Sequence, residues 1–178
     1  MATANPSTQP PNGEDLPPDL DLFQLDLQVC FAVHAAARSF DRVYRRLLQD
    51  LGLTYPQYLV MLTLWEHGDL PVKRLGELLR LDSGTLSPLL KRLDAAGLVQ
   101  RERSPEDERS VIVRLTAEGT AMRAAAQRVP RQIAVASGMT AEQGRELRTR
   151  LEQLTATLDL FGTEAAVGEA LGEGFGEA

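Results

Sequence analysis

The chain contains a single cysteine, Cys30, among its 178 residues, and only 5% of its residues are aromatic. One cysteine cannot form an intrachain disulfide, and such usage is typical of a reducing, cytosolic compartment. No apolar run approaches the roughly 20 residues that a membrane-spanning helix needs. The first residues lack the charged start and apolar core of a signal peptide, so we do not expect secretion.

The net charge of −6 argues weakly against a nucleic-acid partner, but the charge is unevenly distributed. Residues 72–116 contain nine basic and seven acidic side chains and therefore carry +2, whereas the rest of the chain carries −8. The middle of the chain is thus electrostatically distinct from its flanks.

Both ends of the chain contain little that a hydrophobic core would bury. Residues 1–20 are rich in proline and residues 162–178 in Gly, Glu and Ala, so we expect a disordered arm and a flexible tail. One domain is expected between them, over residues 21–161. Apolar side chains there recur at steps of three and four and predict helices, over about 25–50, 55–67, 71–80, 84–96, 117–137 and 140–161.

Capping patterns support these helix boundaries. Thr54 with Gln57, and Thr140 with Gln143, have the spacing of a capping box, and Thr116 is expected to cap the helix after it.

Two prolines lie inside predicted helices. Pro88 is best tolerated in a first turn, so among Asp82, Ser83 and Gly84 we expect the cap near Gly84. Pro130 is expected to interrupt the helix over 117–137.

The segments LVQRER and SVIVRLT are short and β-prone, and the turn-rich SPEDER lies between them, which predicts a β-hairpin. Two short helices followed by a hairpin describe a winged helix-turn-helix, here over about 54–116. The expected fold class is mainly α with a small β-hairpin wing. In that module the second helix enters the DNA major groove, and the hairpin can reach the adjacent backbone or minor groove.

Small polar side chains at the start of the second helix suit contacts with base edges, and basic side chains one turn later suit phosphates. At the tip of the hairpin, an aspartate is placed to orient an arginine. Taken singly, such residues are also typical of helix caps and solvated turns, so their combination and order favour DNA binding. The candidate DNA-binding residues are Ser83, Thr85, Ser87, Lys91, Arg92, Asp107 and Arg109.

The segments CFAVHAAAR, TYPQYLVMLTLWE and LDSGTLSPLLKR, together with DERSV, resemble the MarR (multiple antibiotic resistance regulator) family. Within it they resemble the organic hydroperoxide resistance regulators, over about residues 22–160. The resemblance implies a homodimeric repressor on a pseudo-palindromic operator. It also implies that Ser83–Arg92 lie in the major groove and that Arg109, held by Asp107, reaches the minor groove.

Cysteine is often only a small buried hydrophobe, and position alone favours that interpretation of Cys30. The resemblance reverses it, because these repressors have their sensing cysteine at this place and tyrosines matching Tyr44 and Tyr55 hold its thiolate. Tyr44 follows Cys30 by fourteen residues, or about 21 Å along one helix. The two can therefore meet only across a dimer. His34, where relatives often have tyrosine, is either an ordinary interface histidine or a residue that tunes the thiol.

The expected dimer uses the apolar sides of the helices over about 22–50 and 117–161, which are too apolar to be linkers. The expected effector is an organic hydroperoxide, and a small cellular thiol would cap the oxidised cysteine because no second cysteine is present. We expect no cofactor, metal or enzymatic activity.

Three other interpretations remain open. The first is a MarR-type repressor that responds to a phenolic or other small ligand, with Cys30 inert. The second is a thiol peroxidase, which the missing resolving cysteine and the missing Pro-x-x-x-Thr/Ser-x-x-Cys context disfavour. The third is a winged helix with a purely structural or protein-interaction role.

Overall fold

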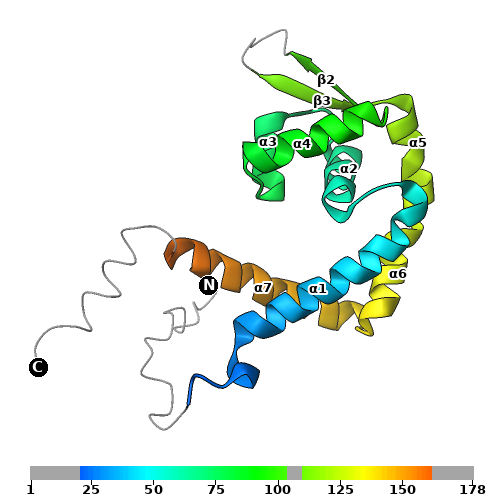
Figure 1. Cartoon of the computed structure of the whole chain (residues 1–178). Coiled ribbons are helices and arrows are strands. Elements are labelled where there is room, and N and C mark those ends of the chain that lie inside the picture. The colour runs from blue at the N-terminus through cyan, green and yellow to red at the C-terminus, as the bar shows by residue number, and fades with distance from the viewer. Residues whose placement is uncertain (1–20, 104–109, 162–178) are drawn as a thin grey trace, which may run out of the picture. The chain divides into compact units, whose positions relative to one another are not determined.

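The computed structural model describes residues 21–103 and 110–161 (Figure 1). The expected arm (1–20) and tail (162–178), and the wing-tip residues Asp107 and Arg109, lie outside the described residues. Cys30–Gly138 form one compact unit, and the described residues on either side of it belong to a second. In the described ranges, no helix combines the length and apolar character needed to cross a membrane.

The winged helix-turn-helix predicted from the sequence is present in the larger unit. Its elements are α2 (Tyr55–His67), β1 (Leu70–Pro71), α3 (Val72–Leu79), α4 (Ser83–Ala95), β2 (Val99–Arg103) and β3 (Val111–Leu115). The antiparallel β2–β3 hairpin runs in register from Val99 opposite Leu115 to Arg103 opposite Val111. The mainly helical fold class with a β-hairpin wing is therefore confirmed.

The sheet contains one strand more than the predicted hairpin. Strand β1 pairs antiparallel with β3, so the strand order is β1-β3-β2. Two residues are too few for an alternating pattern, and β1 is defined only by its pairing with Val113 and Ile112, far along the chain.

The first predicted helix, over 25–50, is wrong in its extent. Helix α1 covers Val29–Leu47, between short 3₁₀ turns η1 (Leu25–Leu27) and η2 (Gln49–Leu51). Gln28 separates η1 from α1 because its backbone is extended, and its side-chain amide donates to the carbonyl of Leu22 at 2.5 Å. Gly52 ends η2 in the left-handed conformation, as glycine does without steric cost.

The helix predicted over 117–137 is interrupted, but not at Pro130 itself. Helix α5 covers Ala117–Ala126, α6 covers Arg128–Ser137, and the break is at Gln127. Pro130 has no N–H to donate to the carbonyl of Ala126, so the helix ends there and restarts with Pro130 in a first turn. Helix α7 (Ala141–Phe161) begins after the predicted Thr140–Gln143 capping box.

The core of the larger unit lies under the winged helix. Its fully buried side chains come from α2, α3, α4, β2 and β3, among them Leu64, Leu75, Leu86, Leu90, Leu93, Val99 and Val113. Each contributes about 1.5–3 kcal/mol through the apolar surface it removes from water. Trp65 donates its indole N–H to the carbonyl of Gly119 at 2.9 Å, which joins α2 to α5 beside this core.

Candidate DNA-binding and thiol sites

Helix α4 begins at Ser83 because the carboxylate of Asp82 caps it. Asp82 accepts from the backbone N–H of Thr85 at 2.8 Å and from the Thr85 hydroxyl at 2.9 Å. The backbone hydrogen bond from Thr85 is the main cause that lowers the pKa of Asp82 below its ordinary value. The expectation of a cap near Gly84 is therefore wrong. Pro88 lies in the second turn, where the helix tolerates the loss of one hydrogen bond.

Helix α4 has a buried face and an exposed face. Leu86, Leu90 and Leu93 are buried in the core. The side chains of α4 that were predicted to bind DNA are exposed: Ser83, Thr85, Ser87, Lys91 and Arg92. The Thr85 hydroxyl donates to Asp82 and so takes part in the cap as well.

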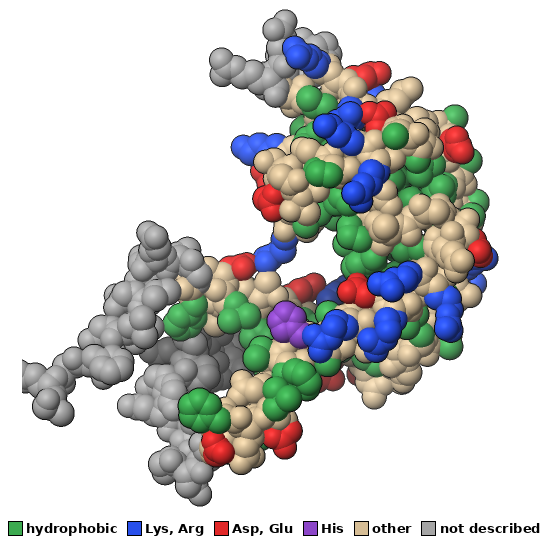
Figure 2. All heavy atoms as spheres, viewed as in Figure 1, with side chains coloured by type: hydrophobic (Ala, Val, Ile, Leu, Met, Phe, Trp, Pro, Cys, Tyr) green, Lys and Arg blue, Asp and Glu red, His purple; other side chains and the backbone are tan. Residues whose placement is uncertain are grey.

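A hollow of about 760 Å³ lies between α3, the start of α4 and the base of the wing. Ser83 and Ser87 line it, together with three basic side chains that the sequence interpretation did not single out: Lys73, Arg80 and Arg101. Arg80 adopts the left-handed conformation (φ 53°) at the turn between α3 and α4. These residues were counted in the positive segment over 72–116, but only the fold shows that they share a surface. In Figure 2, Lys and Arg side chains are spread over the winged-helix elements at the top, interspersed with Asp and Glu.

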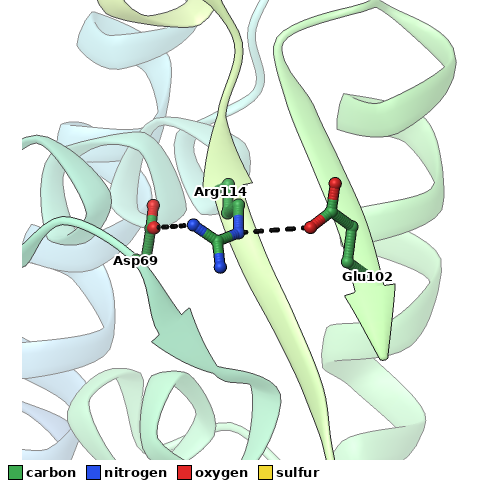
Figure 3. A network of polar contacts seen from close by, with 3 residues as sticks. All are labelled: Asp69, Glu102 and Arg114. Carbon is green, nitrogen blue, oxygen red and sulfur yellow. Dashed lines mark hydrogen bonds and ion pairs between the residues drawn. The ribbon is translucent and has the colours of Figure 1, made fainter. Parts of the chain in front are cut away.

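Two ion pairs fix strand β2 within the module. The guanidinium of Arg101 contacts the carboxylate of Asp94 on α4 at 2.9 Å. On β3, Arg114 lies between Asp69 and Glu102 (Figure 3). The described part of the wing is therefore tied both to α4 and to the residue that precedes β1.

Cys30 is the second residue of α1, and its side chain is exposed, so it does not fill the core of the chain. Tyr44 lies on the same uninterrupted helix, fourteen residues later, at about 21 Å along the axis. Within one chain the structure does not bring Cys30 and Tyr44 together. His34 is exposed one turn after Cys30, on the same face of α1.

Tyr44 and Tyr55 are brought together, in a cluster of rings at the junction of α1 and α2. Their ring centroids are 4.3 Å apart, and that of Tyr58 lies 6.1 Å from Tyr44. Burial, with smaller contributions from Tyr55 and Tyr58, raises the pKa of Tyr44 to about 12. Burial, and then the charge of Asp41, raises the pKa of Tyr55. Both hydroxyls are therefore protonated, and able to donate, at neutral pH.

Tyr58 is a member of this cluster that the sequence interpretation missed. Its side chain is buried, and its hydroxyl has no hydrogen-bond partner among the described residues. Its ring also lies 6.3 Å from that of Trp65. The spacing of three residues from Tyr55 placed both tyrosines on one face of α2, and this was the available signal.

Residues 42–124 match the family described as Transcriptional regulator SarA/Rot. The chain is 45% identical to the organic hydroperoxide resistance transcriptional regulator of Bacillus subtilis, over 78% of this chain and 94% of that protein. It is 49% identical to the HTH-type transcriptional regulator TtmR of Methylorubrum extorquens, over 73% of this chain and 67% of that protein.

Among solved structures, AbfR of Staphylococcus epidermidis is similar to this chain. The structure of reduced AbfR bound to DNA has a TM-score of 0.64 and 36% identity, covering 78% of this chain and 96% of AbfR. AbfR has also been solved in a form with a disulfide, at a TM-score of 0.54 and 37% identity over 74% of this chain and 92% of AbfR. On the winged-helix fold and on the extent of these similarities, the chain belongs to the MarR family of transcriptional regulators.

Proposed function

We propose that the protein is a homodimeric, DNA-binding repressor that releases its operator when an organic hydroperoxide oxidises Cys30. The observation that supports DNA binding most strongly is the exposed face of α4. Ser83, Thr85 and Ser87 are proposed to face base edges, and Lys91 and Arg92 to bind phosphates. Asp107 and Arg109, at the wing tip, are proposed to reach the minor groove.

Exposed apolar side chains support the homodimer. Val29, Phe31, Val33 and Phe40 are exposed along α1, and Leu147, Leu151, Leu154 and Leu158 along α7. A second copy that covers them would remove this surface from water. We propose residues of about 22–50 and 117–161 as the dimerisation region.

The dimer is also what the thiol site requires. Because Tyr44 and Tyr55 lie together about 21 Å along α1 from Cys30, an antiparallel α1 of the second copy is needed to place a thiol beside them. Hydroxyl donors to sulfur favour the thiolate, which is only about 3% of an ordinary thiol at neutral pH. His34, one turn from Cys30, is proposed to line the same site.

The proposed reaction begins with attack of the Cys30 thiolate on the peroxide O–O bond. The sulfur gains one oxygen and becomes a sulfenic acid, while the other oxygen leaves as an alkoxide and takes a proton to form the alcohol. A small cellular thiol then condenses with the sulfenic acid, forming a mixed disulfide and releasing water. The adduct enlarges the thiol site, and repacking of the helices moves the two copies of α4 out of register with the operator.

This proposal is tested by measuring binding of the full-length protein to DNA from upstream of its own gene. Addition of cumene hydroperoxide with a small thiol should release the DNA, and intact mass should show one thiol adduct per subunit. Binding that persists although the adduct has formed would refute the redox switch and leave DNA binding intact.

A cavity gives specific support to a second candidate, in which a small phenolic or other non-redox ligand releases the repressor. The cavity, of about 570 Å³, lies between α2, α5 and the start of α6 and is lined by Tyr58, Leu62, Trp65, Arg123 and Gln127 among others. An aromatic ring would pack on Trp65, and Arg123 would attract an anionic substituent. This candidate predicts release by such a ligand in a variant without Cys30.

A further inference from the structure

Arg114 is at the centre of a network that spans the small sheet (Figure 3). Its Nη1 lies 2.5 Å from Oδ2 of Asp69, and its Nε lies 3.3 Å from Oε2 of Glu102. Asp69 directly precedes β1 and follows Gly68, which ends α2, whereas Glu102 belongs to β2. One guanidinium therefore contacts residues 33 positions apart in the sequence, on both sides of the central strand β3.

The strand register explains this contact. Arg114 is opposite Gln100, so Glu102, two residues further along β2, has its side chain on the same face of the sheet and diagonally opposite Arg114. Arg101 points to the other face, where it contacts Asp94 of α4. Strand β2 is thus held from one face by α4 and from the other by Arg114.

The backbone pairing that attaches the wing to β1 is short. Only two residue pairs join β1 to β3, Leu70 with Val113 and Pro71 with Ile112, and Pro71 has no N–H to donate. The contact of Nη1 with Asp69 is a hydrogen bond, whereas that of Nε with Glu102 is an ion pair without a hydrogen bond. The Arg114 network therefore adds one hydrogen bond and one ion pair at the point where the backbone ladder is shortest.

Arg114 is poorly suited to bind DNA itself. Its single positive charge faces the two carboxylates of Asp69 and Glu102, so the network has a net charge of −1. Its Nε is buried. A direct phosphate contact would require Arg114 to leave both carboxylates.

We propose that Arg114 is a positioning residue for DNA binding, which holds the wing hairpin in a fixed place against β1 and the end of α2. With the wing held in this place, the wing and α4 can contact the operator at the same time. This inference rests on the proposed function, since it presupposes that the protein binds an operator.

The first test is Arg114→Met in the full-length protein, measured by DNA affinity at several salt concentrations. Affinity should fall about tenfold, since two wings are affected in each dimer, while the slope of affinity against salt stays unchanged. Lys91→Met, which removes a proposed phosphate contact, should instead reduce that slope by about two per dimer. The control for the loss of one paired arginine is Arg74→Met, since Arg74 pairs with Glu77 inside α3 at 3.0 Å and joins no two elements of the module.

The sharper test uses Asp69→Asn and Glu102→Gln, which keep the size of each side chain and remove a negative charge. If charge alone mattered, both variants would bind DNA more tightly. The positioning role predicts weaker binding, by about threefold for each. Arg114→Lys should not restore affinity, because lysine keeps the charge without the fork.

The outcomes separate the two proposals. A wild-type protein that binds no DNA from upstream of its own gene refutes the proposed function. A wild type that binds, with Arg114→Met equal to it, refutes only the positioning role. A reduced salt slope for Arg114→Met would mean that Arg114 itself contacts a DNA phosphate. That result would also refute the positioning role. Should Arg114→Met fail to fold, tighter or unchanged binding by Asp69→Asn and Glu102→Gln refutes the positioning role by itself.

Discussion

The rings of Tyr44 and Tyr55 lie 4.3 Å apart at an interplanar angle of 32°, and so join the last turn of α1 to the first turn of α2. Both hydroxyls come from one chain, whereas the Cys30 of that chain is at the far end of α1. In the proposed thiol site, the two hydroxyls of one chain therefore face the cysteine of a second copy.

Tyr44→Phe and Tyr55→Phe should each slow the reaction of Cys30 with organic hydroperoxide by about tenfold or more. Loss of a hydroxyl donor removes a hydrogen bond to the sulfur and to the reacting peroxide, and about 1.4 kcal/mol corresponds to tenfold. DNA affinity should be unchanged. Stopped-flow oxidation rates provide the measurement. Tyr58→Phe is the matched control: its hydroxyl has no partner among the described residues, so we expect the wild-type rate. Wild-type rates in all three variants would mean that the tyrosines serve only packing.

Stability at high pH should depend on Tyr44. The folded chain raises the pKa of this hydroxyl from 10.0 to about 12, so the folded state binds the proton more tightly than the unfolded state. The contribution is fully present below pH 10.0 and is lost as the pH rises to about 12. Urea unfolding across this window should show a free energy of unfolding that falls with pH, and less steeply in Tyr44→Phe. Equal slopes in both proteins would contradict the burial of this hydroxyl.

Gly119→Ala should destabilise the winged-helix unit by about 1–3 kcal/mol or more, because an added Cβ would lie 2.0 Å from the backbone oxygen of Leu98. Gly144→Ala is the matched control on α7, where a Cβ has nothing within 4 Å. That change should stabilise its helix by about 0.5–1 kcal/mol. Urea unfolding at one protein concentration compares them, and equal effects would contradict the close packing of α5 on Leu98.

DNA binding should depend steeply on salt despite the acidic composition. If Lys91, Arg92 and Arg109 each neutralise one phosphate per subunit, a dimer makes six contacts and the log–log slope is about −5. Arg109→Ala should weaken binding and flatten the slope by about two. Fluorescence anisotropy with labelled DNA at several salt concentrations measures both, and a slope near zero would rule out this mode of docking.

The sequence was sufficient for most of the fold, because the helices are amphipathic and their caps are local. The Thr54–Gln57 box, the Thr116 cap and the β2–β3 hairpin are confirmed as predicted. Strand β1 was missed because its identity depends on Val113 and Ile112, some 40 residues away.

The cap of α4 was predicted at the wrong residue because Pro88 was given too much weight. Two hydrogen bonds from Thr85 to Asp82 decide where α4 starts, and the helix accepts the proline one turn further in.

The candidate sites were predicted less completely than the fold. Local spacing identified the exposed residues of α4, but Lys73, Arg80 and Arg101 join them only through the packing of α3 and the wing. Tyr58 was missed for the same reason, since its contact with Tyr44 depends on how α2 packs against α1.

The most direct test of the account is operator binding by Cys30→Ser in the presence of organic hydroperoxide and a small thiol. Serine nearly preserves the volume of cysteine but is not oxidised to a sulfenic acid, so this variant should bind DNA as the wild type does and remain bound. The wild type should lose affinity about a hundredfold, which requires about 2.7 kcal/mol of coupling between the state of the sulfur and DNA, and dithiothreitol should restore binding. If peroxide releases Cys30→Ser as readily as the wild type, Cys30 is not the sensor.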